Sequence, residues 1–565
     1  MNESFAYKTE KRIYDFLPHE PEMMATVLFI IGMSIYYLWR MFAITPQYDE
    51  LYTYYNFISR GPLHSAVTWP STNNHVGYSV ISSLLDLCGN SFIGLRGVSY
   101  VCAVSNLILI NRICRRYYSH WIPFGAMLLY SSMQIVNEYS VQGRGYTLGT
   151  SCFLMSLYVA GYICSVEDAA IIHFVWLSFC FILGMYAVTS SFYWVLPVIT
   201  GISLYLLINA YRSRHLYGKA LNNVYLRKFI RFSKFTVMSA FITLLLYGVI
   251  WLNEGSKMLI QDEGSAFCGL SRGIVLVRAP ATSLLTGLKF MISNPYVRSV
   301  NQGQFKKMYF GWTFGLYDYM MPGLSILVMI IVLFSVILAV QECIRHFAYS
   351  RTVINLMIIC NILIPSLMLL LSHKLPYLKV FNHGAVIVTL SFATFIEMLV
   401  NVGIRSYNNH KKDPGQGKVK AVHRENETVN KDDRWFSGIG IYLPILICLV
   451  YFIYRAGSND FSMQLGEREN DLFNTLYIAN VPKRNNPAVL DCDQQYLMKF
   501  GWDIDCKKTD VQDADCVIID KDMLEPGRTS DDAWKFYADY QTIDWDYIGT
   551  MHPIYENENF ILYVK

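Results

Sequence analysis

Long apolar runs recur along most of this chain, and each is close to the length that crosses a membrane. About 20 predominantly apolar residues span a hydrocarbon core as a helix. Only 16% of the 565 residues are charged, whereas soluble domains carry about 25%. Hydropathy predicts eleven spans, over residues 24–44, 93–111, 121–138, 147–164, 171–189, 192–209, 235–253, 319–340, 353–372, 380–402 and 436–454. We therefore expect an all-α polytopic protein, multi-pass in the cell membrane.

The distribution of Lys and Arg predicts how these spans are oriented. Cytoplasmic connections carry an excess of basic residues. When the spans are counted alternately, the basic segments 112–120, 210–234 and 403–435 all fall on one side of the membrane. This pattern predicts a cytoplasmic N-terminus and an extracytoplasmic C-terminus. The net charge of +4 gives no reason to expect a nucleic-acid partner.

Two domains follow from this topology: a transmembrane domain over 1–454 and a small α/β extracytoplasmic domain over 455–565. In the second domain, short β-like runs are expected at 476–480, 515–520 and 559–565. Helix-like stretches are expected around 489–499 and 531–539. Three cysteines there, Cys492, Cys506 and Cys516, could include one disulfide and would leave one thiol unpaired.

An acidic pair follows the first span, in the sequence TPQYDELYTYY. Adjacent residues on a helix point about 100° apart, so Asp49 and Glu50 do not share a face. One carboxylate could serve as a general base or a metal ligand while the other holds a neighbour in place. The alternative is that either residue caps a juxtamembrane helix. Helical spacing of apolar residues predicts interfacial helices over 50–60 and near 75–87.

Other polar residues are predicted on the same membrane face as the acidic pair. Arg96 lies near the outer end of the second span, where an arginine costs about 2.5–3.5 kcal/mol unless it pairs or reaches the interface. Arg144 follows the third span between two glycines, and Tyr146 comes next but one. His75 lies in the first outer segment. Arg96 costs less if it faces an anionic group in the protein interior or on a ligand. For both arginines the alternative is contact with lipid headgroups, but their coincidence with the acids on one face favours a site.

The order of these residues resembles the GT-C superfamily of lipid-linked-sugar glycosyltransferases, in its protein O-mannosyltransferase and aminoarabinose-transferase-like branch. The resemblance covers roughly the first 165 residues. It rests on four elements: Tyr48-Asp49-Glu50, Asn74-His75-Val76-Gly77-Tyr78, Leu95-Arg96-Gly97-Val98-Ser99 and Gly143-Arg144-Gly145-Tyr146-Thr147. Two departures weaken it. The prolines of the family's HPP element are Val76 and Gly77, and the Leu-Pro of its span-two element is Gly97-Val98.

The resemblance implies an inverting transfer of a sugar from a polyprenyl-phosphate donor to an acceptor on the outer face. Asp49 would deprotonate or orient the acceptor hydroxyl, and Glu50 would support it or help to bind a divalent cation such as Mg, Mn or Zn. Arg96 and Arg144 would bind the donor phosphate, with Tyr146 as a hydrogen-bond partner. The acceptor would be a glycan, a lipid or a protein.

A second basic cluster, in SHKLPYLKVFNHG, lies at the outer end of the ninth predicted span. Lys379 is a further candidate for the donor phosphate, and His383, like His75, for substrate or metal contact. The alternative is a belt of residues that reach the lipid headgroups, formed by His373, Lys374, Lys379 and His383.

Two other classes of protein remain as alternatives. A transporter or flippase would place polar groups near the midplane and often shows repeated halves, but the spans carry few such charges and no repeat is evident. A polymerase of lipid-linked glycans would not be expected to show the ordered acidic and arginine elements.

Overall fold

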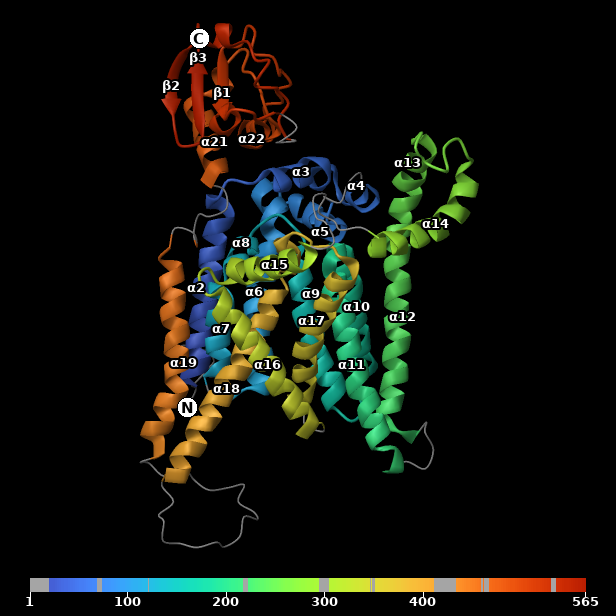
Figure 1. Ribbon diagram of the computed structural model, residues 1–565. Coiled ribbons are helices and arrows are strands. Elements are labelled where there is room, and N and C mark those ends of the chain that lie inside the picture. The colour runs from blue at the N-terminus through green and yellow to red at the C-terminus, as the bar shows by residue number, and fades with distance from the viewer. Residues whose placement is uncertain are drawn as a thin grey trace, which may run out of the picture.

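The computed structural model describes residues 20–68, 74–119, 121–216, 222–293, 304–345, 347, 351–410, 433–458, 461, 467–529 and 535–565. Helices make up nearly all of the membrane part, and the sheet is confined to a domain at one end of the bundle (Figure 1). We call this the domain end; the N-terminal residues of the described chain lie toward the opposite end (Figure 1).

Eight helices in the described part of the chain are long and apolar enough to cross a membrane, and three shorter apolar helices match the remaining predicted spans. The prediction of a polytopic helical membrane protein is therefore confirmed. The bundle consists of α2 (Pro21–Ala43), α6 (Ser91–Tyr117), α7 (Ile122–Ser132), α9 (Tyr146–Ser165), α10 (Ile171–Ala187), α11 (Phe192–Arg212), α12 (Val224–Ile250), α16 (Ser325–Arg345), α17 (Arg351–Ser372), α18 (Gly384–His410) and α19 (Asp433–Ala456).

The third predicted span, 121–138, is not one continuous helix. Met133 has an extended backbone with φ −71° and ψ 132°, which ends α7 and separates it from α8 (Gln134–Tyr139). The 11 residues of α7 would extend only about 16 Å. The short α8 is buried throughout, so this segment carries polar side chains into the protein below the domain end.

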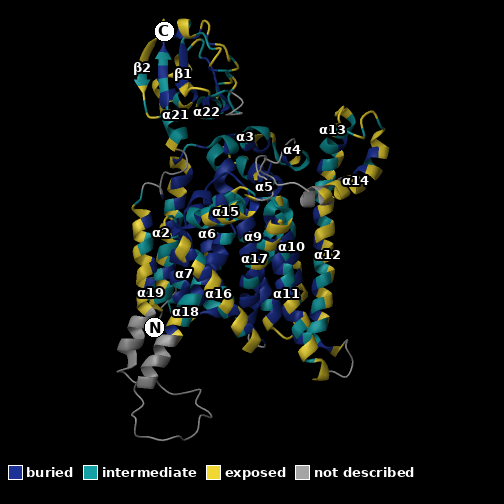
Figure 2. Ribbon diagram, in the orientation of Figure 1, coloured by how far each residue is buried: buried dark blue, intermediate teal, exposed yellow. Residues whose placement is uncertain are grey.

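The outer faces of the bundle are apolar, as lipid contact requires. Val237 and Leu244 on α12 are 69% and 70% exposed, and Ile326 on α16 is 64% exposed. Figure 2 shows exposed residues along the outer helices and buried residues in the centre. Large exposed apolar surface of this kind is unfavourable in water, so these faces suit a hydrocarbon environment.

Short helices cover the domain end of the bundle (Figure 1). After α2 the chain forms α3 (Tyr48–Asn56), η1 (Ile58–Arg60), α4 (Pro62–Val67) and α5 (Val76–Asp86), and α15 (Phe305–Met320) lies across the same end. The chain thus forms short helices at both places where the sequence predicts interfacial ones. After α12 the chain continues as the π-helical η5 (Trp251–Gly255), α13 (Ser256–Gln261) and α14 (Arg272–Ser293).

The C-terminal domain is a small α/β unit. Its antiparallel sheet has the order β1-β3-β2, formed by β1 (Cys516–Asp520), β2 (His552–Glu556) and β3 (Phe560–Val564), with Cys516 opposite Val564. Alternate residues of β1 enter two different cores, with Ile518 on one side and Val517 on the other. Two cores around one strand explain why all of β1 is buried.

Three details of this domain differ from the sequence predictions. The run 476–480 is not a strand, because Leu472, Thr475 and Leu476 are buried at helical spacing in α21 (Glu467–Ile478). No helix forms over 535–539, and the earlier part of that prediction lies outside the described residues. Cys492, Cys506 and Cys516 are free thiols.

The helix expected near 489–499 is present as α22 (Cys492–Trp502). Asp491 caps its first turn, because its side chain accepts a hydrogen bond from the Gln494 backbone N–H at 2.7 Å.

Candidate functional site

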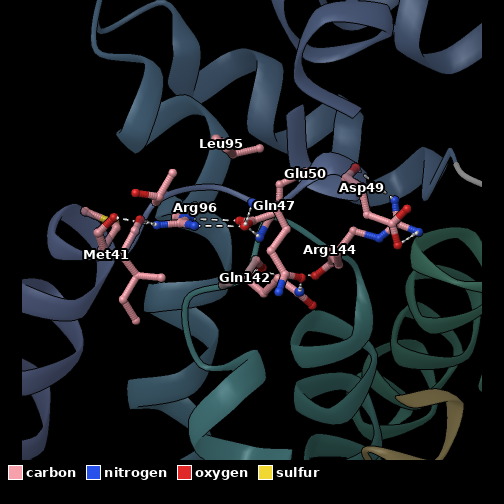
Figure 3. Close-up of polar contacts among 12 residues, drawn as sticks. Met41, Gln47, Asp49, Glu50, Leu95, Arg96, Gln142 and Arg144 are labelled. Atoms are coloured by element: carbon pink, nitrogen blue, oxygen red, sulfur yellow. Dashed lines mark hydrogen bonds and ion pairs between the residues drawn. The ribbon is translucent and has the colours of Figure 1, made fainter. Parts of the chain in front are cut away.

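The acidic pair lies at the start of α3, directly after the turn that follows α2. Glu50 accepts a hydrogen bond from the Gln47 backbone N–H at 3.0 Å, which satisfies one of the amides at this helix terminus. Glu50 is 1% exposed, whereas the Asp49 side chain is 32% exposed. Figure 3 shows the two carboxylates on different sides of the helix, as expected for adjacent helical residues.

Glu50 is paired with Arg96 from α6. Two parallel hydrogen bonds of 2.8 Å join Arg96 Nε to Glu50 Oε1 and Arg96 Nη2 to Glu50 Oε2 (Figure 3). Glu50 Oε1 also accepts from the Gly143 N–H at 2.7 Å, and Oε2 accepts from Gln47. Each oxygen therefore accepts two hydrogen bonds, which fills the acceptor capacity of the carboxylate.

Arg96 is held from its other side by backbone carbonyls. Its Nη1 donates to Met41 O at 3.0 Å and to Ile44 O at 2.7 Å, both at the end of α2. These contacts and the Glu50 pair use four of the five N–H groups of the guanidinium. Arg96 therefore ties α2, α3 and α6 together in a fully buried position, and it does not point toward the surface.

Asp49 faces two cations instead. Lys379 Nζ, from the 3₁₀ turn η7 (Leu378–Phe381), donates to Asp49 Oδ2 at 3.0 Å. Arg144 Nη2 lies 4.0 Å from the same oxygen. Burial would raise the pKa of Asp49, but Arg144 and then Lys379 outweigh it, and the pKa lies below its ordinary value. Asp49 is therefore an ionised, partly accessible carboxylate beside two positive charges.

Arg144 is fixed by the helix that carries the acids. Its Nη1 donates to Thr53 Oγ1 at 3.0 Å and to the Asp49 carbonyl at 3.3 Å. The glycines on either side of Arg144 allow its loop to pack closely against neighbouring segments. A Cβ at Gly145 would lie 2.6 Å from Ala187 O and 3.0 Å from His75 Nδ1.

His75 packs against the same loop. Its Nδ1 accepts a hydrogen bond from the Gly145 N–H at 2.8 Å, and its ring meets Tyr146 edge-on at 4.9 Å. Burial first, then Arg144 and Lys379, lower the pKa of His75 well below its ordinary value. The imidazole is therefore neutral with its proton on Nε2, a tautomer inferred from the bond that Nδ1 accepts.

Tyr146 and His383 line one narrow pocket of about 10 Å³, roughly the space of a single water molecule. Its polar wall also includes Ser190, Ser191 and Asn382. The residues of the basic cluster predicted near 373–383 therefore lie in different places. Lys379 bonds to Asp49, and His383 lines the same pocket as Tyr146. The His373 ring packs against the ring of Phe305, with centroids 4.8 Å apart.

The described residues do not form a metal site. No group of three or more His, Cys, Asp or Glu side chains in that part of the chain is arranged to hold an ion. Glu50, one of the two predicted ligands, has its acceptor positions filled by Arg96 and by backbone amides. Asp49, the other, faces two cations, which would repel a divalent ion.

Two residues of this region were not predicted from the sequence. Thr53 holds Arg144, and its position four residues after Asp49 on one helix was a signal that could have found it. Lys535 of the C-terminal domain lies close enough to Asp49 to lower its pKa further. No sequence signal connects residues so far apart in the chain.

The C-terminal domain packs directly on α3. Leu51 is fully buried within the core formed by α21, α22 and the sheet. Tyr55 stacks on Tyr496 with ring centroids 5.8 Å apart and planes 9° from parallel. The helix that carries Asp49 and Glu50 is therefore shared between the membrane part and the domain.

Fold and site together define a polytopic membrane protein that holds an acidic residue between two cations beneath a small α/β domain. No family model matches this sequence, and no curated protein matches it. Among solved structures, the chain is similar to the crystal structure of ArnT from Cupriavidus metallidurans bound to undecaprenyl phosphate. The alignment covers 95% of this chain and 97% of that one, with 11% identity and a TM-score of 0.40. A likeness this loose does not assign that protein's fold or activity to this chain.

Proposed function

We propose that this protein is an inverting membrane glycosyltransferase of the GT-C type, which moves a sugar from a polyprenyl-phosphate donor to an acceptor hydroxyl. The observation that carries the proposal is the position of Asp49, 3.0 Å from Lys379 Nζ and 4.0 Å from Arg144 Nη2, at the domain end of a membrane bundle. A base beside two phosphate-binding cations, at the level of lipid headgroups, suits this reaction.

In the proposed reaction Asp49 is the general base. The acceptor oxygen attacks the anomeric carbon while its proton passes to an Asp49 carboxylate oxygen. The bond between that carbon and the phosphate oxygen breaks, and the polyprenyl phosphate leaves with the electron pair. Attack opposite the leaving group inverts the anomeric centre. The partial exposure of Asp49 leaves room for an acceptor to approach.

Arg144 and Lys379 would stabilise the negative charge that develops on the departing phosphate. With no donor bound, Lys379 is bonded to Asp49 and helps to keep its pKa low. A donor phosphate would draw Lys379 away from the carboxylate. The pKa of Asp49 would then rise because one stabilising cation is shared, and the carboxylate would become a stronger base when substrate is present.

The remaining candidates take supporting roles in this proposal. Arg96 and Glu50 hold α3 in place, because their polar atoms are directed at each other and at backbone groups. His75 supports the loop that carries Arg144, through the Gly145 amide and the Tyr146 ring. The pocket between Tyr146 and His383 has room for about one water molecule, so it would have to widen for these two residues to contact the donor sugar or phosphate. No step is assigned to a divalent cation, since the described residues do not provide its ligands.

The proposed orientation places the domain end outside the cell, with the N-terminus in the cytoplasm. The proposal keeps a transmembrane domain over 1–454 and an extracytoplasmic domain over 455–565, with the boundary near the end of α19 at Ala456. The acceptor would be a glycan, a lipid or a protein that reaches the seam between α3 and the C-terminal domain.

The proposal is tested with purified protein in detergent and a panel of isotope-labelled polyprenyl-phosphate sugars, with extracted envelope material as acceptor. We expect release of free polyprenyl phosphate together with labelled acceptor, and no reaction with nucleotide sugars. Movement of intact lipid-linked sugar across liposomes without cleavage would contradict the proposal and support a flippase.

A further inference from the structure

A cleft of about 840 Å³ opens at the end of the bundle opposite the candidate site. It lies between the beginning of α2 and the final turns of α6 and α9. Arg112 is sixteen residues beyond Arg96 on α6, so the cleft and the site are separated by about 24 Å along that helix. This separation is close to the thickness of a hydrocarbon core of about 30 Å. The cleft therefore belongs to the other membrane surface.

The lining of this cleft combines cations with aromatic rings. It consists of Glu20, Met23, Arg112, Arg115, Arg116, Tyr158 and Tyr162. Three arginines face Glu20 in the lining and Glu22 close to Arg115, so the cleft carries more positive than negative side chains. Tyrosine rings and a methionine supply apolar wall beside these charges, which is a suitable arrangement for the boundary between headgroups and acyl chains.

Arg116 is held rigidly at the wall of this cleft. Its Nη2 donates to Gly161 O at 3.0 Å, and its guanidinium lies 4.4 Å from the centre of the Tyr162 ring. A Cβ at Gly161 would collide with the Tyr117 hydroxyl and would lie 3.5 Å from Arg116 Nε, so the glycine keeps this wall of the cleft closely packed. The guanidinium is thus oriented before any ligand binds.

Arg115 is partly buried, as Arg116 is, whereas Arg112 is exposed. Arg115 Nη2 pairs with Glu20 Oε2 at 2.9 Å, and the Glu20 side chain is 74% exposed. Arg112 is exposed and forms no hydrogen bond or ion pair with the residues that the structure describes. Guanidinium groups match phosphate oxygens geometrically, and basic pockets between membrane helices on the cytoplasmic side bind lipid headgroups.

We propose that this cleft binds the phosphate of an anionic glycerophospholipid from the leaflet opposite the C-terminal domain. All three arginines contact the phosphate oxygens, Arg112 and Arg115 from the side where the lipid enters. Glu20 competes with the phosphate for Arg115. Tyr158 and Tyr162 pack against the glycerol and upper acyl chains. The site is independent of the proposed transfer reaction, because it lies at the other end of α6 and α9.

The test is thermal unfolding of the full-length protein in neutral detergent, with added phosphatidylglycerol, phosphatidylcholine or inorganic phosphate, alongside native mass spectrometry of retained lipid. A ligand that binds only the folded protein raises the unfolding temperature. We expect stabilisation by phosphatidylglycerol and little by phosphatidylcholine. Equal stabilisation by inorganic phosphate alone would overturn the assignment to a lipid and indicate a site for free phosphate.

Three variants test which residues are responsible. Each arginine near a membrane surface contributes roughly a fivefold effect on binding, so R112Q/R115Q should weaken phosphatidylglycerol binding at least about tenfold. Arg214→Gln is the matched control, since this exposed arginine lies over the Tyr211 ring after α11, outside the cleft. Glu20→Gln should strengthen binding by removing the competing carboxylate. Unchanged binding in R112Q/R115Q, or an equal loss in Arg214→Gln, would overturn the proposal.

Discussion

Glu50 and Arg96 are joined by two parallel hydrogen bonds of 2.8 Å, and both side chains are almost completely buried. This pair fixes the helix that carries the neighbouring Asp49. Because adjacent residues diverge on a helix, anchoring Glu50 toward α6 turns Asp49 toward Arg144 and Lys379. The Glu50 carboxylate is thus buried and fully paired, whereas the Asp49 carboxylate stays partly accessible.

Breaking this pair from one side should destabilise the protein strongly. Glu50→Gln or Arg96→Met leaves a buried charge without its counter-charge, which typically costs about 3–5 kcal/mol. The double variant E50Q/R96M should recover part of that loss, because no uncompensated charge remains. Thermal unfolding in detergent measures all three. Additive losses in the double variant would contradict a direct coupling between the two side chains.

Removing Lys379 should change the pH dependence of transfer. Lys379 helps to lower the pKa of Asp49 against burial, which raises it. In Lys379→Met the pKa of Asp49 should therefore rise, and the acidic limb of kcat/KM should move to higher pH, because a protonated carboxyl cannot act as a base. Lys379→Arg keeps the charge and should leave the limb nearly in place. If the acidic limb does not move in Lys379→Met, Lys379 does not influence the pKa of the general base, and this prediction is contradicted.

The hydroxyl of Thr53 should matter for the position of Arg144. Thr53→Val keeps the shape and removes the oxygen that accepts from Arg144 Nη1 at 3.0 Å. A hydrogen bond to a charged group contributes about 1.5–3 kcal/mol, so we expect a tenfold or greater rise in the KM for donor. Thr200→Val is the control, since among the described residues its hydroxyl bonds only to the Leu196 carbonyl within α11. Equal KM values for both variants would contradict the role of Thr53.

Gly145→Ala should disturb the loop that carries Arg144. The new Cβ would lie 2.6 Å from Ala187 O and 3.0 Å from His75 Nδ1, so backbone must move. We expect a lower unfolding temperature and reduced transfer. Gly248→Ala on α12 has open space around its Cβ and should be neutral or stabilising by up to about 1 kcal/mol. Equal unfolding temperatures for the two variants would show that the loop tolerates the side chain.

Hydropathy was sufficient to predict the membrane fold, because every long span in this chain must be apolar over about 20 residues. It failed at Met133, where one extended residue divides an apolar run into two helices. Periodicity failed at 476–480, since a five-residue window cannot distinguish a strand from the last turn of a helix such as α21.

The sequence could place several polar residues at one end of the bundle, but it could not pair them. Asp49, Glu50, Arg96, Arg144 and His75 lie close together in the structure, and their functional roles stay predictions. Which carboxylate pairs with which cation depends on the orientation of α3. That orientation is set by long-range packing, including the burial of Leu51 in the C-terminal domain. Such contacts join residues far apart in the chain, so the local sequence does not predict them.

The most direct test of the account is sugar transfer by purified Asp49→Asn protein, compared with Asp49→Glu and wild type. The unfolding temperature of each variant is measured first, to show that all three proteins are folded. The amide keeps the shape of the side chain and cannot accept the proton of the acceptor. We predict that Asp49→Asn binds polyprenyl-phosphate sugar but loses at least about 100-fold in kcat, the lower range for general-base catalysis, while Asp49→Glu retains measurable activity. Transfer by Asp49→Asn at the wild-type rate would contradict the assignment of Asp49 as the base.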